Sequence, residues 1–481
     1  MKTKAWRTSA RFSVFTAAAT SMLLTGCTMG PDYKRPEVQP LPASYRFQLS
    51  PGEATSYADL SWWAAFQDPA LQKLIAEAVA NNYDVQIAAS RIEQARAQLG
   101  VARSEAYPQL NYTVTVGGQR ALVQGLNTVG TADIGFASGL IDAAWELDIW
   151  GRIRRSTEAA RANLFAQEEV RRGVMLTLAT DVASGYFRLL QLDRQLAVAE
   201  ESTGAYKKTF DLFDLRFRAG KDSNLSVQRA EAIYNASLAT AADLKRQIAQ
   251  QENALCVLLG SYPRAIARAR LANYSLPATP LGATSDLMQR RPDIRAAEQS
   301  MVAANAEIGV AVANFFPRIG LSAIGGGEGI HLAGANTGFG LWSAGLSATG
   351  PIFNGGRLQS IYEGQKAYWD ETVAQYRKTV LVAFRETSDA LTAQQNLATR
   401  RDALEAQVVN LRQSFDLALT RYDGGRASYF EVLEAQQQLY PVEGELAQTE
   451  GDQLLATVSL YKALGGGWKM TPAEWKQAAT Q

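Results

Sequence analysis

Cysteine and histidine, on which many catalytic and metal sites depend, are scarce in this sequence. It contains two cysteines and one histidine among 481 residues. Two cysteines cannot build a disulfide framework, and one histidine with one further cysteine cannot assemble a zinc site or a Cys-His pair. We therefore expect no enzyme activity, no metal and no cofactor.

The sequence also lacks a large excess of positive or negative charge, and it lacks long apolar runs. The chain has 48 Lys and Arg residues against 47 Asp and Glu residues, so it has no strongly basic surface and nucleic acid is not an expected partner. After the first 26 residues no stretch of 18 uninterrupted apolar residues occurs. A membrane-spanning helix is therefore not expected.

Proline is absent from two long segments, between Pro108 and Pro263 and between Pro351 and Pro441. From Arg357 to Tyr422 apolar residues recur every three, four or seven positions, which is typical of an amphipathic helix. One continuous helix there would be roughly 100 Å long at about 1.5 Å per residue. The alternative is several shorter helices of a large soluble bundle. Pro441 lies inside a helical pattern, and we expect a kink or break there.

Residues 1–26 have the layout of an export signal, with four cationic residues followed by a short apolar stretch. The stretch ends in Leu24-Thr25-Gly26-Cys27, which resembles the lipobox of bacterial lipoproteins. In such proteins the cysteine is acylated and becomes the N-terminus, so we expect a covalent lipid on Cys27 and an extension over 27–67. Thr28, in place of Asp, favours delivery to the outer membrane. The alternative is an ordinary signal with an incidental cysteine; Cys256, in an apolar run, is expected to be a small core residue.

The chain repeats itself at long range. Gly100 and Gly309 occupy equivalent places before two similar helical patterns end, and Arg216 and Gly220 later match Arg421 and Gly425. A repeat that extends from Gly100 to its equivalent, Gly309, is too long to be one unit of a solenoid. We predict two structural repeats, 68–280 and 281–468, followed by a tail, 469–481.

Each repeat contains two alternating segments that predict a β-hairpin. The apolar positions are Leu110, Tyr112, Val114 and Val116, then Ala143, Trp145, Leu147 and Ile149, and in the second repeat Ile319, Leu321, Ala323, Trp342, Ala344, Leu346 and Ala348. Strands of about ten residues suit a membrane β-barrel. The glycine-rich segments 125–130 and 325–340 are expected to form long tips, the second placing His331 at the exterior. Four strands cannot close a barrel, whereas two chains supply eight and three supply twelve.

Five motifs together resemble the TolC-type outer membrane factors, in particular their lipoprotein or NodT branch. They are residues 30–36 after Cys27 (GPDYKRP), 62–69 (WWAAFQDP), 145–152 (WELDIWGR), 289–294 (QRRPDI) and 461–468 (YKALGGGW).

The resemblance implies a mainly α fold with a membrane β-barrel portion. Three identical chains would form a twelve-stranded barrel continuous with a long periplasmic α-helical barrel. The resemblance also implies an outer-membrane exit duct for multidrug efflux, with a periplasmic adaptor (membrane fusion protein) and an inner-membrane RND pump as partners. A duct for type I protein secretion is the alternative, and a trimeric coiled-coil adhesin or envelope spacer would lack the amphipathic strands.

The resemblance further singles out the second helical turn, where Glu431 and Glu434 correspond to paired aspartates of the TolC constriction. They are candidates for a periplasmic gate, and the first repeat has Ser226 and Arg229 at the equivalent places. Ala427 stands where TolC has an arginine of its gating network, so the latch is expected to differ. The alternative is a capping box, with Ser428 capping the next helix and Glu431 completing it.

Overall fold

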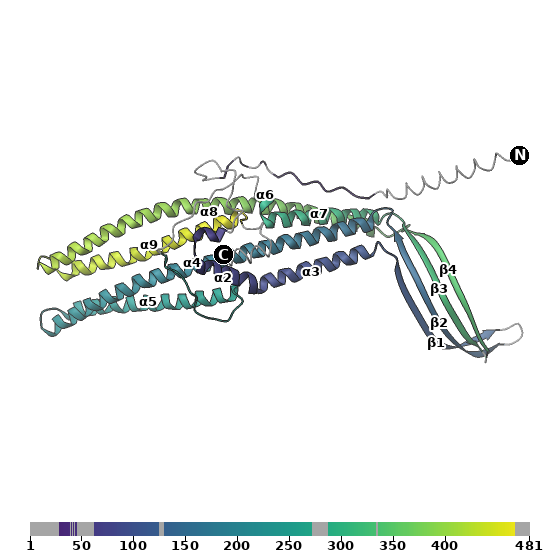
Figure 1. Cartoon of the computed structure of the whole chain (residues 1–481), viewed down its shortest axis with the longest axis horizontal. Coiled ribbons are helices and arrows are strands. Elements are labelled where there is room, and N and C mark those ends of the chain that lie inside the picture. The colour runs from purple at the N-terminus through teal and green to yellow at the C-terminus, as the bar shows by residue number, and fades with distance from the viewer. Residues whose placement is uncertain are drawn as a thin grey trace. The chain divides into compact units, whose positions relative to one another are not determined.

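The computed structural model describes residues 28–38, 40, 42, 44–45, 62–124, 129–271, 287–332 and 335–466. Its elements are η2 (Trp62–Phe66), α2 (Pro69–Asn81), α3 (Tyr83–Ser104), β1 (Gln109–Gln124), β2 (Val129–Leu147), α4 (Arg152–Arg218), α5 (Asn224–Leu258), α6 (Leu287–Arg290), α7 (Pro292–Ala313), β3 (Arg318–Leu332), β4 (Ala335–Thr349), α8 (Arg357–Asp423) and α9 (Tyr429–Ala463) (Figure 1). Signal residues 1–26, Cys27 and the tail 469–481 lie outside the described part.

The order of elements repeats along the chain. Helix α4 and helix α8 each have 67 residues, and α5 and α9 each have 35. The predicted continuous helix from Arg357 is therefore confirmed, and the alternative of several short helices is wrong for this segment. No described helix combines the length and apolar character needed to cross a membrane.

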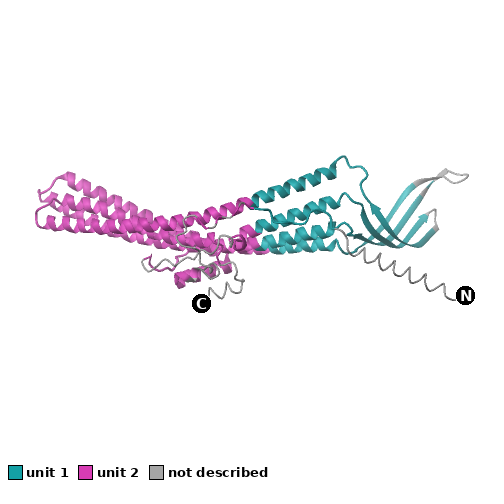
Figure 2. Ribbon diagram, turned by 90° about the horizontal axis from the view of Figure 1, so that it is seen from above, with its two compact units in different colours: residues 1–37, 91–168, 296–376 teal, residues 38–90, 169–295, 377–481 magenta. Residues whose placement is uncertain are grey.

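The chain divides into two compact units that are not the two repeats (Figure 2). Unit 1 comprises residues 1–37, 91–168 and 296–376, and unit 2 comprises residues 38–90, 169–295 and 377–481. Each unit therefore takes residues from both halves of the chain. Unit 1 holds the four strands with parts of α3, α4, α7 and α8, and unit 2 holds α2, α5, α6 and α9 with the remaining helical parts.

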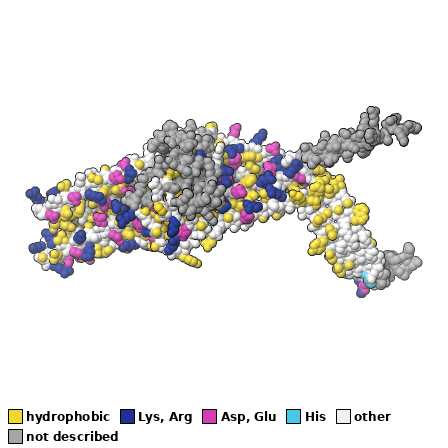
Figure 3. Space-filling model, in the orientation of Figure 1, with side chains coloured by type: hydrophobic (Ala, Val, Ile, Leu, Met, Phe, Trp, Pro, Cys, Tyr) yellow, Lys and Arg dark blue, Asp and Glu magenta, His cyan; other side chains and the backbone are white. Residues whose placement is uncertain are grey.

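The four strands of unit 1 form one antiparallel sheet in the order β1-β2-β3-β4. The register pairs Leu110 with Ala143, Ala143 with Ala323, and Ala323 with Ala344. Paired residues of an antiparallel sheet share a face, so the apolar series predicted on the separate strands form one continuous surface. That surface is exposed in the single chain, for example at Tyr112 (81%) and Trp342 (83%). Figure 3 shows hydrophobic and uncharged side chains over most of the visible sheet.

The strands are longer than expected. They have 16, 19, 15 and 15 residues rather than about ten. The segment 325–340 was expected to be a tip, but most of it belongs to β3 and β4, and His331 pairs with Asn336 near the end of the hairpin. Glycine at 326 has a physical reason, because a Cβ there would lie 2.1 Å from the Gly139 carbonyl oxygen on β2.

The sequence around Trp150 explains how α4 begins. Asp148 accepts hydrogen bonds from the backbone N–H groups of Ile153 (3.0 Å) and Arg154 (2.9 Å), which have no partner within the helix. The Trp150 ring stacks on Phe316, with centroids 4.7 Å apart, and its Nε1 donates to the Pro317 carbonyl. These contacts join the ends of β2 and α7 within unit 1.

Unit 2 contains the largest described hydrophobic cluster. Its fully buried members include Trp63, Tyr186, Phe187, Leu255 and Cys256. Cys256 is a free thiol with no exposed surface, which confirms its predicted place in the core. A second cluster brings Tyr45 to Leu460 and Leu464, with Phe384 beside it, so the extension after Cys27 also contributes to the core of this unit.

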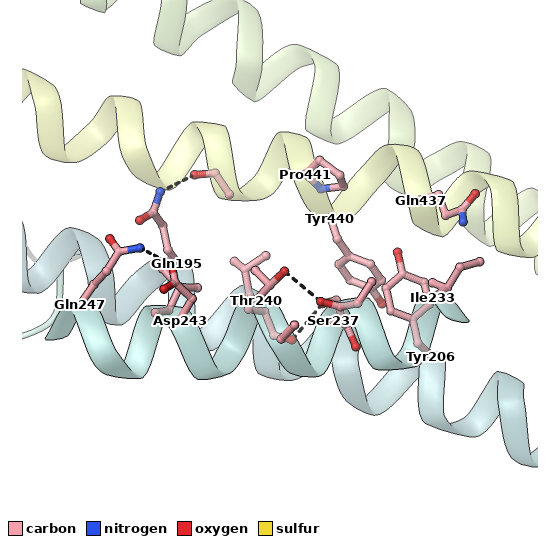
Figure 4. Close-up of a pocket in the computed structure, with 17 residues that line it drawn as sticks. Gln195, Tyr206, Ile233, Ser237, Thr240, Asp243, Gln247, Gln437, Tyr440 and Pro441 are labelled. Atoms are coloured by element: carbon pink, nitrogen blue, oxygen red, sulfur yellow. Dashed lines mark hydrogen bonds between the residues drawn. The ribbon is translucent and has the colours of Figure 1, made fainter. Parts of the chain in front are cut away.

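A kink or break was expected at Pro441, and the break is wrong because helix α9 continues through this residue. It is one helix from Tyr429 to Ala463 with the proline inside it, and Figure 4 shows the ribbon continuing past Pro441. A proline cannot donate to the carbonyl four residues earlier, that of Gln437. Pro441 and Gln437 line an open groove of about 890 Å³ between α4, α5 and α9. The side of α9 that carries the proline is thus not packed against a core.

Candidate functional site

The turn between α8 and α9 is built by two glycines. Gly425 has φ +69°, a left-handed conformation that glycine adopts without steric cost. Its N–H donates to the Tyr422 carbonyl (2.9 Å), and the Arg426 N–H donates to the Arg421 carbonyl (2.7 Å). This pair of hydrogen bonds ends a helix by satisfying its last carbonyl groups. The turn after α4 has the same pattern around Gly220.

Glu431 lies at the start of α9 and faces back toward α8. Its Oε2 is 3.5 Å from Nη1 of Arg421, and both side chains are about half exposed. Ser428 occupies the cap position, but its side chain makes no capping hydrogen bond. The capping box is therefore not formed. Because the ion pair is solvated, we expect it to contribute only about 0–1 kcal/mol, so it can be opened at little cost.

Glu434 follows one turn later on α9 and is exposed. Glu431 and Glu434 are three positions apart, so they share one side of the helix. Arg229, its equivalent in the first repeat, places its guanidinium 5.4 Å from the centre of the Phe430 ring. The two repeats therefore present opposite charges at one equivalent position, Arg229 and Glu434, and only the second repeat presents a pair of carboxylates.

A network of side-chain contacts links α4 to the turn between α8 and α9, and it was not predicted from the sequence. Nη1 of Arg216 donates to the hydroxyl of Tyr422 (2.8 Å), and the hydroxyls of Thr209 and Tyr429 are 2.9 Å apart. The Tyr422 and Tyr429 rings meet edge to face at 4.8 Å. One signal was available, since the repeat aligns Arg216 with Arg421. Both arginines contact the second turn, one through a tyrosine and the other through Glu431.

A small apolar cluster packs beside these polar contacts. Phe213, Val227 and Ala230 are buried, and Tyr429 packs on them with its ring 5.5 Å from that of Phe213. The turn between α8 and α9 is thus held by one small aromatic cluster and a few part-buried side-chain hydrogen bonds. Such an arrangement favours a turn that can separate from α4 as a unit.

The segment that follows the predicted lipid site is fixed to unit 1. Cys27 itself lies outside the described residues, but the next residues lie along α4 and α7. Arg155, with a side chain only 4% exposed, pairs with Asp32 (2.8 Å) and donates to the Met29 carbonyl (3.2 Å). Gly30 packs so closely on α7 that a Cβ there would lie 2.5 Å from the Gly309 Cα.

Further along the segment, Arg35 and Glu298 form a two-point ion pair. The Nε–Oε1 and Nη2–Oε2 distances are 2.6 and 2.5 Å. Tyr33 donates to the same carboxylate, and burial together with Glu298 raises the pKa of Tyr33 to about 12. Residues 28–36 therefore form a strap on the helices, which accounts for the GPDYKRP motif.

No group of three or more His, Cys, Asp or Glu side chains in the described parts of the chain could hold a metal ion. His331 bonds to Asn336 beside the hairpin end, with Nδ1 2.6 Å from Oδ1. A histidine paired with an amide is not by itself an arrangement for nucleophilic or acid-base chemistry.

Comparison with known proteins agrees with this geometry. The sequence model described as "Outer membrane efflux protein" matches residues 74–261 and 283–466. The chain is 37% identical over 461 residues to the solvent efflux pump outer membrane protein SrpC of Pseudomonas putida, covering 94% of this chain and 97% of that protein. It is 33% identical over 459 residues to the cation efflux system protein CusC of Escherichia coli (strain K12), covering 93% and 98%.

A solved structure of the outer-membrane channel OprN shares the fold. The TM-score is 0.82 at 28% identity, and the match covers 92% of this chain and all of that one. The predicted fold class is therefore confirmed: long helices with a four-stranded sheet in each chain, as in this channel.

Proposed function

The chain belongs to the outer membrane efflux protein family, and from this premise we propose that it is the exit duct of a tripartite efflux system. In this proposal three identical chains form a passive channel through the outer membrane. A periplasmic adaptor connects the channel to an inner-membrane pump of the RND class, which supplies the energy and selects the substrates.

The sheet of unit 1 is the observation that carries the proposal. One of its faces is apolar on all four strands and exposed in the single chain. Strands β1 and β4 each have one neighbour, so two edges are unpaired. In a lipid bilayer unpaired backbone groups cost several kcal/mol each, and joining the edges of several chains removes that cost. Three chains give twelve strands and leave a lumen, whereas two give eight and fill it with side chains.

Native mass measurement in mild detergent and single-channel recording test this architecture together. We expect a particle of three chains that conducts ions. A single chain with full conductance would contradict the proposal, and so would a trimer that conducts no current.

The names of the relatives support efflux over protein secretion. SrpC is named for a solvent efflux pump and CusC for a cation efflux system. Because such different cargoes share one kind of channel, we propose that cargo is chosen by the pump and not by this chain. No catalytic or cofactor role is part of the proposal.

We also propose that Cys27 carries lipid and places the chain in the NodT lipoprotein branch. The strap supports this, because residues 28–36 lie along the helices directly after that cysteine. A Cys27→Ser variant should lose the acyl mass and remain with its signal peptide uncleaved. Recovery of a normally processed variant in the outer membrane would show that the cysteine is incidental.

The proposed organisation keeps the repeats at 68–280 and 281–468. The two segments matched by the family's sequence model lie one within each repeat, and the equal helix lengths support duplication. Within this organisation Glu431 and Glu434 are proposed to line the periplasmic gate, with the Arg421 ion pair and the Arg216–Tyr422 bond holding the turn at rest.

A further inference from the structure

The strap marks one face of helix α7. Glu298 pairs with Arg35, Asn305 donates to the Pro31 carbonyl (2.8 Å), and Gly309 lies against Gly30. These three α7 residues are spaced by seven and four positions, so they share one side of the helix. Acyl chains on Cys27 must enter the membrane that surrounds the channel. The strap side of α7 is therefore the outer side of the proposed channel.

Glu307 lies on the opposite side of α7. It is two residues from both Asn305 and Gly309, which corresponds to about 200° around the helix axis. Within unit 1 its side chain lines a hollow of about 800 Å³ with residues of α3 and α4. If the strap lies outside, this hollow opens toward the lumen. The inference that the hollow faces the lumen rests on the proposed trimeric channel.

The hollow is lined by groups that bind ligands through hydrogen bonds. Its polar residues include four side-chain amides, Gln94, Gln98, Asn163 and Gln167. Within the part of the chain that is described, none of these amides and no oxygen of the Glu307 carboxylate has a hydrogen-bond or ion-pair partner. Burial raises the pKa of the Glu307 carboxyl above its ordinary value, which indicates that a counter-charge is missing.

Two other charged residues line the hollow. Glu105 is paired with Arg152 at 2.9 Å, and the same guanidinium also pairs with Glu146 at 2.8 Å. Arg91 is exposed, and it lies seven residues before Gln98 on α3, which is roughly 10 Å along the helix. Among the described residues, Glu307 is therefore a carboxylate of the hollow without an ion-pair partner.

The composition of the hollow decides the class of cation. The described residues contain no group of three or more metal-ligating side chains, so a bare metal ion lacks ligands here. The volume falls within the range of about 300–1,000 Å³ typical of small-molecule sites. We propose that Glu307 and the surrounding amides form a lumen-facing binding site for organic amines in their protonated form, with one copy in each chain.

The duplication supplies a natural comparison for this site. Glu307 precedes Gly309 by two residues, as Gln98 precedes Gly100 in the first repeat. The trimer would then carry three carboxylates alternating with three amides at one level of the tunnel. A Glu307→Gln substitution makes the two repeats alike, and a Gln98→Glu substitution doubles the charge.

Block of single-channel current by spermine, added from the extracellular side, tests the site. We expect Glu307→Gln to weaken the block about tenfold, the loss typical of one charge-assisted contact. Gln98→Glu should strengthen it. Glu93→Gln is the matched control, because Glu93 lies on α3 outside the hollow and pairs with Arg96; its block should equal that of the unmodified channel.

The outcomes separate this inference from the proposed function. A conducting trimer whose spermine block is unchanged in both Glu307→Gln and Gln98→Glu overturns the amine site and leaves the channel standing. A chain that forms no conducting trimer overturns the channel. If Glu307→Gln alone fails to assemble, an unchanged block in Gln98→Glu still refutes the site.

Discussion

Arg35 reaches Glu298 across 263 positions of sequence and binds it with two parallel hydrogen bonds of 2.6 and 2.5 Å. The pair is partly exposed on the Arg35 side, where 48% of the side chain is accessible. It fixes the far end of the strap, while Arg155 fixes the end near Cys27.

Glu298→Gln should loosen the strap without unfolding the channel. Because Arg35 remains partly solvated, we expect a loss of about 1 kcal/mol. Hydrogen exchange of the amides in residues 28–36 should become faster, while exchange in α4 stays unchanged. Unaltered exchange in the strap would mean that Arg155 and Gly30 hold it alone.

Glu307→Gln should have the opposite effect on stability. The carboxyl pKa is raised in the folded chain, so the folded state binds the proton more tightly than the unfolded state does. Glu307 therefore costs stability as pH rises from the ordinary glutamate pKa through the raised folded value. We expect the variant to melt at a higher temperature than the unmodified chain at pH 7, with the difference vanishing at low pH. A lower melting temperature at pH 7 would contradict a missing counter-charge.

The double variant Glu431→Gln, Glu434→Gln tests the gate. Three chains would bring six carboxylates to one constriction, and a ring of negative charge attracts cations and repels anions. We expect weaker cation preference and weaker block by divalent cations added from the periplasmic side, with trimer assembly intact. Block from the extracellular side by spermine should remain, because Glu307 is unchanged. Equal selectivity in a correctly assembled double variant would refute a constriction at these residues.

Pro441→Ala should stabilise α9. The alanine N–H restores the hydrogen bond to the Gln437 carbonyl, and proline inside a helix is about 3 kcal/mol less favourable than alanine. Since α9 already accommodates the proline without a break, we expect a gain of about 1–3 kcal/mol. Thermal unfolding of the assembled protein measures it. A loss of stability would show that contacts of the proline ring around the groove outweigh the missing hydrogen bond.

Local patterns in the sequence predicted most of the fold. The absence of proline predicted α8, and the alternation from Leu110 predicted which side of the sheet is apolar. Local patterns failed where tertiary contacts decide. The glycines of residues 325–340 suggested a long tip, but Gly326 lies in β3, where the close approach of β2 leaves no room for a Cβ. Pro441 suggested a kink or break, but α9 does not break there, and Pro441 lines an open groove.

The candidate site was predictable only in part. The resemblance identified Glu431 as a candidate. Comparison of the repeats supported it, because the first repeat has Ser226 at the equivalent position and so the carboxylate occurs in the second repeat alone. The partner of Glu431 was not found, because Arg421 comes from the preceding helix and the capping box appeared equally consistent with the sequence. Contacts between distant segments, such as Arg216 with Tyr422 or Arg35 with Glu298, leave no periodic trace in the sequence.

The pairing of β2 with β3 has a consequence for the order in which the protein forms. Trp145 lies opposite Leu321, about 175 residues later in the chain, so closing this part of the sheet is entropically costly and slow. A two-stranded hairpin is marginally stable at best on its own. The β1–β2 hairpin is therefore made well before β3, and the edge of β2 that pairs with β3 stays unpaired until α4, α5, α6 and α7 have followed. Throughout that interval the nascent chain is prone to aggregate and depends on being kept apart from its neighbours.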